Sequence, residues 1–167
     1  MNDHAVHRPA AHPHKGSWHA YGMFALNLAL SLIPMYLAMF SMVDRWADYR
    51  NNLNMLYMAL TMLAPMGMIM LATMGSMYPS KRANLAWYAG LALLFGASLY
   101  ATRSQSLVDD RQFVASMIPH HSGAILMCRE ARLSDPELVK LCADIVRAQR
   151  AEIAQMEAIA ARLASTR

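Results

Sequence analysis

A stretch of twelve residues, 117–128, is the part of this chain richest in side chains that can bind a metal. Its candidate ligands are Met117, His120, His121, Met127 and Cys128. Thioether, imidazole and thiolate groups favour Cu(I), with Ag(I) as a mimic, over Mg, Ca or Mn. If the stretch is helical, the 100° step per residue puts these ligands in one arc of roughly 120°, which Pro119 should bend. The sequence therefore predicts a soft-metal face on one helix.

A second helix should face the first. Ser134 as N-cap, Pro136 in the first turn and Glu137 three residues after Ser134 form a capping box. Residues 107–165 are therefore expected to form an antiparallel helical hairpin with its turn near residue 135. That turn predicts three pairs at equal levels: Cys128 with Cys142, His121 with Gln149, and Met117 with Ile153.

The second helix contributes further candidate ligands, because Cys142, Gln149 and Met156 recur every seven residues and share one seam. Each ligand also has a plainer interpretation. The histidines could be a polar patch bonded to carbonyls that Pro119 frees, the methionines could be core residues, and the two cysteines could form a disulfide. The complete predicted metal site is His120, His121, Met117, Met127, Met156, Cys128 and Cys142.

Catalytic patterns are missing from the sequence. It contains no Glu-x-x-His pair of a di-iron bundle and no His-Glu-x-x-His zinc-protease helix. It also offers no nucleophile, base and orienter set, and the apolar segments contain no ionisable group for a proton relay. We expect a protein that is not an enzyme and that uses no organic cofactor.

Composition indicates a membrane protein. Hydrophobic residues make up 56% of the 167 residues, and three runs without charged residues or histidine, 21–42, 53–74 and 84–101, each approach the roughly 20 residues that cross a bilayer. The formal charge of +4 comes mainly from loops and the C-terminal segment, which argues against nucleic-acid binding. We expect a tail (1–20), a three-span region (21–103) and a metal-binding hairpin (104–167).

The second span carries a methionine ladder. Its members are Met55, Met58, Met62, Met66, Met70, Met74 and Met77. Their spacings of three and four place them within an arc of roughly 160°. Thioethers could pass Cu(I) across the bilayer, but a packing stripe would have the same pattern. Because no Pro or Gly lies between Ala97 and Ile118, the third span could continue unbroken into the hairpin.

The N-terminal residues 1–19 lack a periodic apolar face, so we expect a mobile tail. The histidines there could capture metal loosely or be incidental. They are His4, His7, His12, His14 and His19.

The motif Met117-Ile-Pro-His-His-Ser-Gly-Ala-Ile-Leu-Met127, followed by Asp135-Pro-Glu-Leu and Ala148-Gln-Arg-Ala-Glu-Ile-Ala-Gln-Met156, resembles the domain-of-unknown-function 305 family. Three spans with a Met-rich second helix resemble its membrane-anchored branch. The resemblance implies a ferritin-like helical bundle associated with copper or silver binding outside the cytoplasm. It implies Met117, His120, His121, Met127 and Met156 as ligands, whereas the cysteines are outside its pattern.

The predicted fold class is all-α, with three transmembrane helices and then the antiparallel hairpin, a ferritin-like half bundle. A hairpin below about 60 residues is marginal alone, so we expect a homodimer that completes a four-helix bundle. Three spans place the tail and hairpin on opposite sides, but Lys and Arg near the spans are balanced and do not orient the protein. The resemblance implies a bacterial inner membrane, with the hairpin in the periplasm or outside the cell.

The leading hypothesis is a membrane-anchored Cu(I)/Ag(I)-binding protein for copper sequestration, handover or tolerance, with a copper-handling protein as possible partner. One alternative is a transport component that uses the methionine ladder. Another is a structural or partner-binding membrane module without metal.

Overall fold

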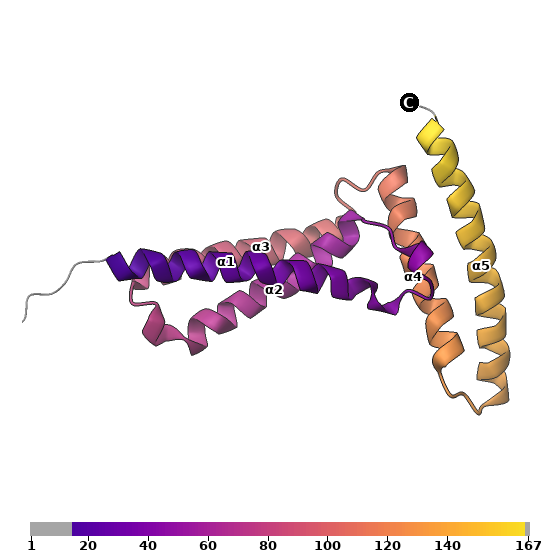
Figure 1. The fold of residues 1–167 in the computed structure, drawn as a ribbon, viewed down its shortest axis with the longest axis horizontal. Helices are drawn as coiled ribbons and strands as arrows, with labels where there is room; N and C mark the ends of the chain where they lie inside the picture. The colour runs from indigo at the N-terminus through magenta and orange to yellow at the C-terminus, as the bar shows by residue number, and fades with distance from the viewer. Residues whose placement is uncertain (1–14, 166–167) are drawn as a thin grey trace, which may run out of the picture.

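The computed structural model describes residues 15–165, and in this part of the chain it contains helices and no strands (Figure 1). The long helices are α1 (Lys15–Ala38), α2 (Leu53–Thr73), α3 (Lys81–Ser104), α4 (Asp110–Glu130) and α5 (Pro136–Ser165). Three short 3-10 helices are η1 (Met39–Met42), η2 (Trp46–Asp48) and η3 (Gly75–Met77). The all-α prediction is confirmed. Four histidines of the predicted tail, His4, His7, His12 and His14, lie outside the described residues, whereas residues 15–20 belong to α1.

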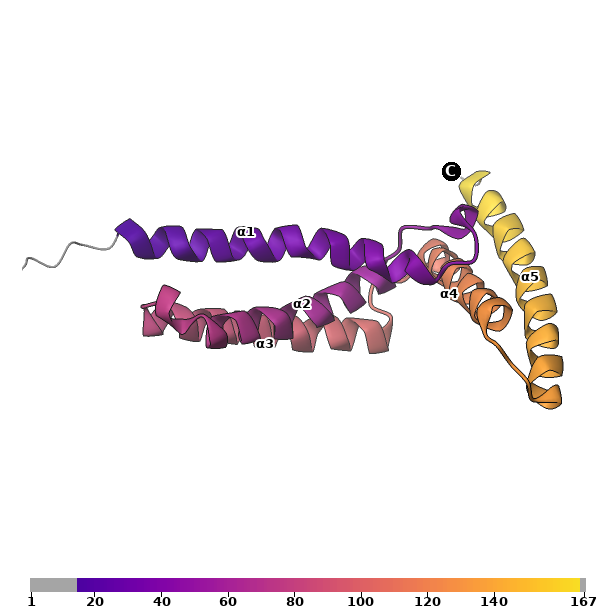
Figure 2. The ribbon, with the colours of Figure 1, turned by 60° about the horizontal axis from the view of Figure 1, so that its bottom comes forward.

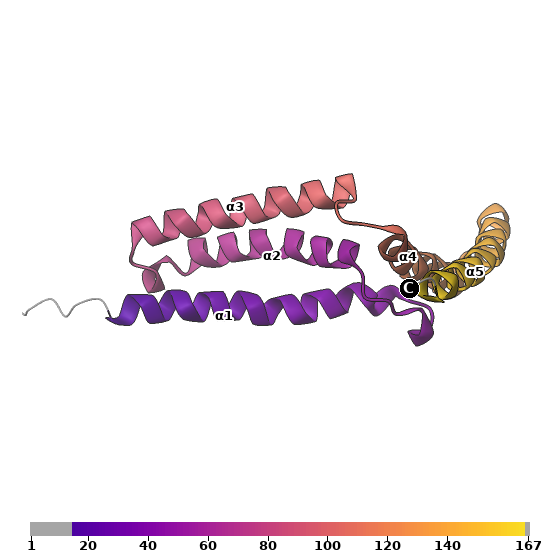
Figure 3. The same cartoon turned by 90° about the horizontal axis from the view of Figure 1, so that it is seen from above.

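Within the described residues, three helical segments are long and apolar enough to cross a membrane: His19–Met42, Leu53–Thr73 and Lys81–Ser104. They lie side by side, and α4 and α5 cross one end of this layer at a steep angle (Figures 1 and 2). The start of α1 lies at the opposite end (Figure 3). The chain therefore has an apolar three-helix part and, at one end of it, a two-helix part that carries the predicted metal ligands.

The centre of the three-helix part depends on a close approach at Gly67. A Cβ atom there would lie 3.0 Å from Leu91 Cδ1 and 3.2 Å from Leu28 Cδ2. The buried face of α2 consists of Ala59, Leu63, Ala64, Gly67 and Leu71. The methionine ladder lies beside this face: Met66 and Met70 pack partly against the core, whereas Met58, Met62 and Met74 are exposed.

The third span does not continue into the hairpin, contrary to our expectation. α3 ends at Ser104, and Gln105 has a left-handed backbone with φ 52°. Contacts with α2 hold the break, since Tyr57 Oη donates to the Ser106 carbonyl at 2.8 Å. Asp109 then caps α4. A non-glycine residue adopts this conformation because tertiary contacts offset its cost.

α4 and α5 lie side by side and run in opposite directions (Figure 1). Their shared core consists of Val114, Ile118, Ile125 and Ile153. The predicted N-cap of α5 is corrected by one residue: the Asp135 carboxylate, not Ser134, accepts the Glu137 and Leu138 N–H groups at 2.9 and 3.0 Å. Pro136, whose fixed φ suits the first helical position, makes the residue before it the cap.

Candidate functional site

His121 is buried between α4 and α5, with 8% of its surface exposed. Its Nδ1 lies 2.9 Å from the Met117 carbonyl oxygen, one turn earlier on α4. Its Nε2 lies 2.7 Å from Glu152 Oε2 on α5. A metal bound at Nε2 needs the lone pair of this nitrogen, which is then no longer available for a hydrogen bond. The metal would therefore have to take the place of the Glu152 contact. The Nδ1 contact is the one that commonly orients a metal-binding histidine.

The predicted partner of His121 at the same level of the second helix was Gln149, and the observed partner is Glu152. Glu152 is three residues after Gln149, so both residues lie on neighbouring positions of one helix face. The observed partner of His121, Glu152, lies less than one helical turn from the predicted partner, Gln149. The spacing alone could not choose between these two neighbours, whereas the folded structure brings Glu152 into contact with His121.

Ser122 is fully buried and joins α4 to the connecting loop, which we define as residues 43–50. Its Oγ accepts the Asp44 N–H at 2.8 Å and donates to Asp48 Oδ2 at 2.6 Å. The Asp48 residue is only 1% exposed. A buried carboxylate is costly unless hydrogen bonds satisfy it, so Ser122 supplies part of what keeps Asp48 in place.

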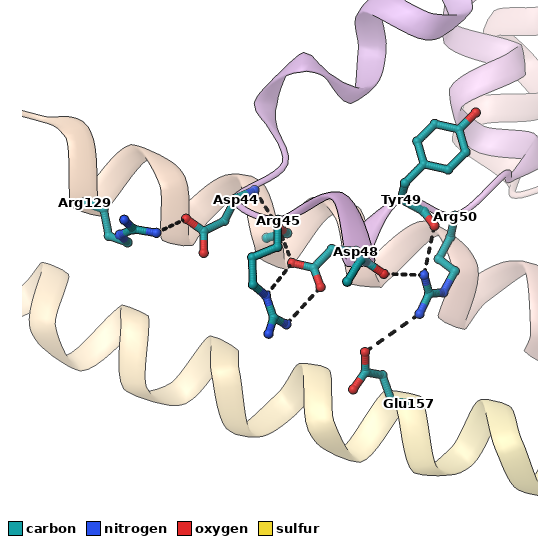
Figure 4. Close-up of polar contacts among 9 residues, drawn as sticks. Asp44, Arg45, Asp48, Tyr49, Arg50, Arg129 and Glu157 are labelled. Atoms are coloured by element: carbon teal, nitrogen blue, oxygen red, sulfur yellow. Dashed lines mark hydrogen bonds and ion pairs between the residues drawn. The ribbon is translucent and has the colours of Figure 1, made fainter.

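Arginine residues complete the polar contacts of the connecting loop (Figure 4). Arg45 Nη2 lies 3.0 Å from Asp48 Oδ1. The hydrogen bond to Asp48 and the charge of this carboxylate raise the pKa of Arg45, which therefore keeps its positive charge. Arg129 of α4 donates to Asp44 Oδ1 at 2.5 Å.

Gly123, which follows His121 and Ser122 in the motif, contacts a third segment of the fold, η1. A Cβ atom there would lie 3.3 Å from the Met42 carbonyl oxygen of η1. The absence of a side chain therefore lets the end of the first span approach the α4 backbone. His121, Ser122 and Gly123 thus contact α5, the connecting loop and η1 respectively.

The other predicted histidine has a different environment. His120 is exposed, and its ring centroid lies 5.9 Å from that of His121. Met127 is also exposed, at 60%, while Met117 is half-buried. Met156 packs against the core of α4 and α5. The predicted ligand arc is therefore divided between the α4–α5 contact and the open side of α4.

Cys128 and Cys142 form a disulfide, and their Cα atoms lie 5.2 Å apart. The predicted proximity of the two cysteines is confirmed. Of the two interpretations, a disulfide or a pair of metal ligands, the structure contains the disulfide. In this form the sulfurs are not thiolate ligands, so a metal role for the cysteines would require reduction. A cavity of about 470 Å³ lies beside them, lined also by Leu133, Val139 and Val146.

Residues 15–165 contain no group of three or more His, Cys, Asp or Glu side chains that could hold a metal ion. Neither Asp48 nor Ser122 was predicted as a site residue from the sequence. The charged residues between the first two spans were the sequence signal that could have pointed to Asp48. Their contact with α4 depends on the folded chain.

These arrangements can be compared with known proteins. The family Domain of unknown function (DUF305) matches residues 43–160, and the chain belongs to this family. The match begins at the connecting loop, so it includes both sides of the contact between Asp48 and Ser122. It extends well beyond the motif on α4 and α5.

A relative is the uncharacterized protein L153 of Acanthamoeba polyphaga mimivirus, which is 33% identical over 143 residues. The alignment covers 82% of this chain and 90% of that protein. No solved structure matches the chain.

Proposed function

We propose that this protein is a membrane-anchored Cu(I)-binding protein, with Ag(I) as a mimic, that sequesters or hands on copper through α4 and α5. The observation that carries the proposal is that three candidate ligands, His121, Met117 and Met156, lie at adjacent levels along α4 and α5. Met117 is four residues before His121 on α4, and Met156 is four residues after Glu152 on α5. Because His121 and Glu152 are in contact and four residues make about one helical turn, Met117 and Met156 lie at the next level of the antiparallel pair.

The donor set suits Cu(I) better than a hard ion. Two thioethers and one imidazole match the preference of Cu(I) for soft ligands, and a single carboxylate does not make a site for Mg or Ca. Glu152 would act as a competitor that occupies His121 Nε2 in the metal-free protein. The exposed His120 and Met127 would accept or release the ion in exchange with a copper-handling partner protein.

The decisive experiment is an anaerobic Cu(I) titration of the purified protein against a competing chelator. We expect binding that the His120→Ala/His121→Ala variant loses and that Met117→Leu and Met156→Leu each weaken at least tenfold. Met58→Leu, which removes an exposed thioether from α2, is the matched control and should bind normally. Glu152→Gln should bind more tightly, because it removes the competitor. Failure of the intact protein to compete with the chelator would refute the proposal.

A second copy would complete the two-helix part as a four-helix bundle. The open side of α4 carries exposed residues that are seven positions apart, namely Phe113, His120 and Met127. Phe113 is 53% exposed although it is apolar. This is the spacing of a helix-packing seam, and a copy of the same seam is a suitable partner. A monomer in mass photometry in mild detergent would count against this dimer.

The disulfide supports an orientation for the chain. Disulfides persist in oxidising compartments, so α4 and α5 would lie in the periplasm or outside the cell, and the start of α1 would face the cytoplasm. This assignment agrees with the orientation that the family resemblance implied. The membrane would be the bacterial inner membrane.

A structural module that binds another membrane protein is the second candidate function. The contacts of His121, Ser122 and Gly123 favour it, because each of these residues joins α4 to a different segment and needs no metal to do so. Absence of Cu(I) binding together with co-purification of a membrane partner that depends on α4 would select this candidate.

A further inference from the structure

A cavity of about 430 Å³ lies between α1 and α2, at the end of the spans nearest α4. Its walls include the aliphatic side chains Leu32, Ile33, Leu37, Leu53 and Leu56. Ile33 and Leu37 are more than half exposed, at 57% and 53%. We call this cavity the cleft. Because α1 and α2 are candidate spans, a bilayer that they cross would lie beside it.

The end of the cleft nearest α4 is polar and ordered by hydrogen bonds. Tyr36 Oη donates to Asn51 Oδ1 at 3.2 Å and accepts the Asn52 N–H at 3.3 Å. Gln112 Oε1 of α4 accepts the Leu53 N–H at 2.9 Å. The cleft is therefore amphipathic, with aliphatic walls inside the span and amides at the boundary with α4.

Two amide nitrogens at this end have hydrogens to donate. The oxygens of Asn51 and Gln112 accept hydrogen bonds, but Asn51 Nδ2 and Gln112 Nε2 have no hydrogen-bond partner within residues 15–165. Each is a neutral donor. A ligand for this cleft should therefore have an aliphatic chain and, at its polar end, an uncharged oxygen that accepts hydrogen bonds.

We propose that the cleft binds one acyl chain of a membrane glycerolipid, with the ester carbonyl accepting from Asn51 and Gln112. The chain would lie along Leu37 and Leu56 and would enter from the bilayer without leaving the apolar phase. Neutral amide donors match an ester carbonyl better than an anionic phosphate, which recruits Arg or Lys. Since Gln112 is in α4, the bound lipid would contact both the spans and the helix that carries His121. This inference does not depend on copper binding.

Native mass spectrometry of the full chain in mild detergent tests the proposal, with a neutral diester phosphatidylcholine as the added lipid. We expect one lipid to be retained per chain. Leu56→Trp, which fills the cleft, should lower the retained fraction at least tenfold. Leu93→Trp makes the same change on the exposed surface of α3 and should leave retention unchanged. Equal retention by the two variants would overturn the proposal.

A second comparison tests the polar end and does not rely on a core substitution. A diether lipid with the same headgroup and chains lacks the ester carbonyls, so it should be retained about fivefold less for each hydrogen bond lost, the factor that corresponds to about 1 kcal/mol. The Asn51→Ala/Gln112→Ala variant should bind the diester and diether lipids alike. Equal retention of both lipids by the unmodified protein would refute recognition of the carbonyl.

Discussion

Three consecutive motif residues contact three different segments of the fold. His121 contacts Glu152 of α5, Ser122 holds Asp48 of the connecting loop, and Gly123 lets η1 approach α4. A variant of one of these residues that fails to bind Cu(I) would therefore not by itself identify a ligand, because the substitution also removes a structural contact. His120 is the informative position, because it is exposed and its substitution should leave the packing of α4 unchanged.

Ser122→Ala should lower the free energy of unfolding by about 1–3 kcal/mol, because it removes a donor from the buried Asp48 carboxylate and the acceptor of the Asp44 N–H. Denaturant unfolding in detergent measures this change. Ser104→Ala is the control: Ser104 is exposed, and its Oγ contacts the Tyr100 carbonyl of its own helix and the Ser106 hydroxyl two residues later. Because water can replace these exposed contacts, the substitution should change stability by less than about 0.5 kcal/mol. Equal effects of both substitutions would contradict the structural role of Ser122.

Gly123→Ala should cost stability although alanine is the better helix former. The new Cβ would crowd the Met42 carbonyl oxygen, which belongs to the backbone and moves less readily than a side-chain end. At Gly90 a Cβ would meet no atom within 4 Å, so Gly90→Ala should be neutral or stabilise by up to about 1 kcal/mol. Thermal unfolding of the two variants compares them. A Gly123→Ala protein as stable as Gly90→Ala would mean that η1 does not pack against α4 as described.

Among the elements, the connecting loop joins the three-helix part to both helices of the two-helix part. Arg129 binds Asp44 on the α4 side, and Arg50 lies 3.8 Å from Glu157 on the α5 side. The Arg50–Glu157 pair is exposed on both sides and contributes little energy, whereas the Asp44 side chain is only 4% exposed. The carboxylates of Asp48 and Asp44 are both buried, and a buried carboxylate is costly unless hydrogen bonds satisfy it. The contacts of Ser122 with Asp48 and of Arg129 with Asp44 therefore contribute most to the attachment.

The disulfide should stabilise the pairing of α4 and α5 by about 3 kcal/mol, the value expected for a closed loop of about 15 residues; the two cysteines are separated by 14 positions. A dithiol reductant should therefore lower the midpoint of denaturant unfolding. The Cys128→Ser/Cys142→Ser variant should unfold at the midpoint of the reduced protein and should not respond to reductant. A midpoint that reduction leaves unchanged would argue against this contribution.

At the scale of the molecule, the two-helix part lies at one end of the candidate spans and the start of α1 at the other (Figure 1). The three candidate spans within residues 15–165 would place these two ends on opposite sides of a membrane that all three cross. Because Lys and Arg are balanced between the sides, charge does not select an orientation. The disulfide supplies an independent criterion.

A reporter that is active only outside the cytoplasm, such as alkaline phosphatase, should therefore be active when fused after α5. The physical reason is that the disulfide between Cys128 and Cys142 requires an oxidising compartment. Thiol labelling of whole cells under denaturing conditions should label these cysteines only after reduction. If a reporter that is active only in the cytoplasm were active when fused after α5, the orientation would be contradicted.

The sequence by itself determined the features that depend on local composition and helical period. Apolar runs at 21–42, 53–74 and 84–101 predicted three helices that differ from the observed candidate spans by a few residues, because length and hydropathy suffice to define such a segment. A turn near residue 135 and the helical rise were enough to bring Cys128 to the level of Cys142. Family membership followed from a motif of fixed spacing, without knowledge of its contacts.

Tertiary structure decided the features that depend on residues far apart in the chain. Asp48 and Ser122 are 74 positions apart, and no periodicity relates them. The choice of Glu152 over Gln149 as the partner of His121, and the end of α3 at Gln105, likewise depended on neighbouring helices. Local sequence predicts the level of a side chain along its helix, but a contact also requires a partner whose position is determined by packing of the whole chain.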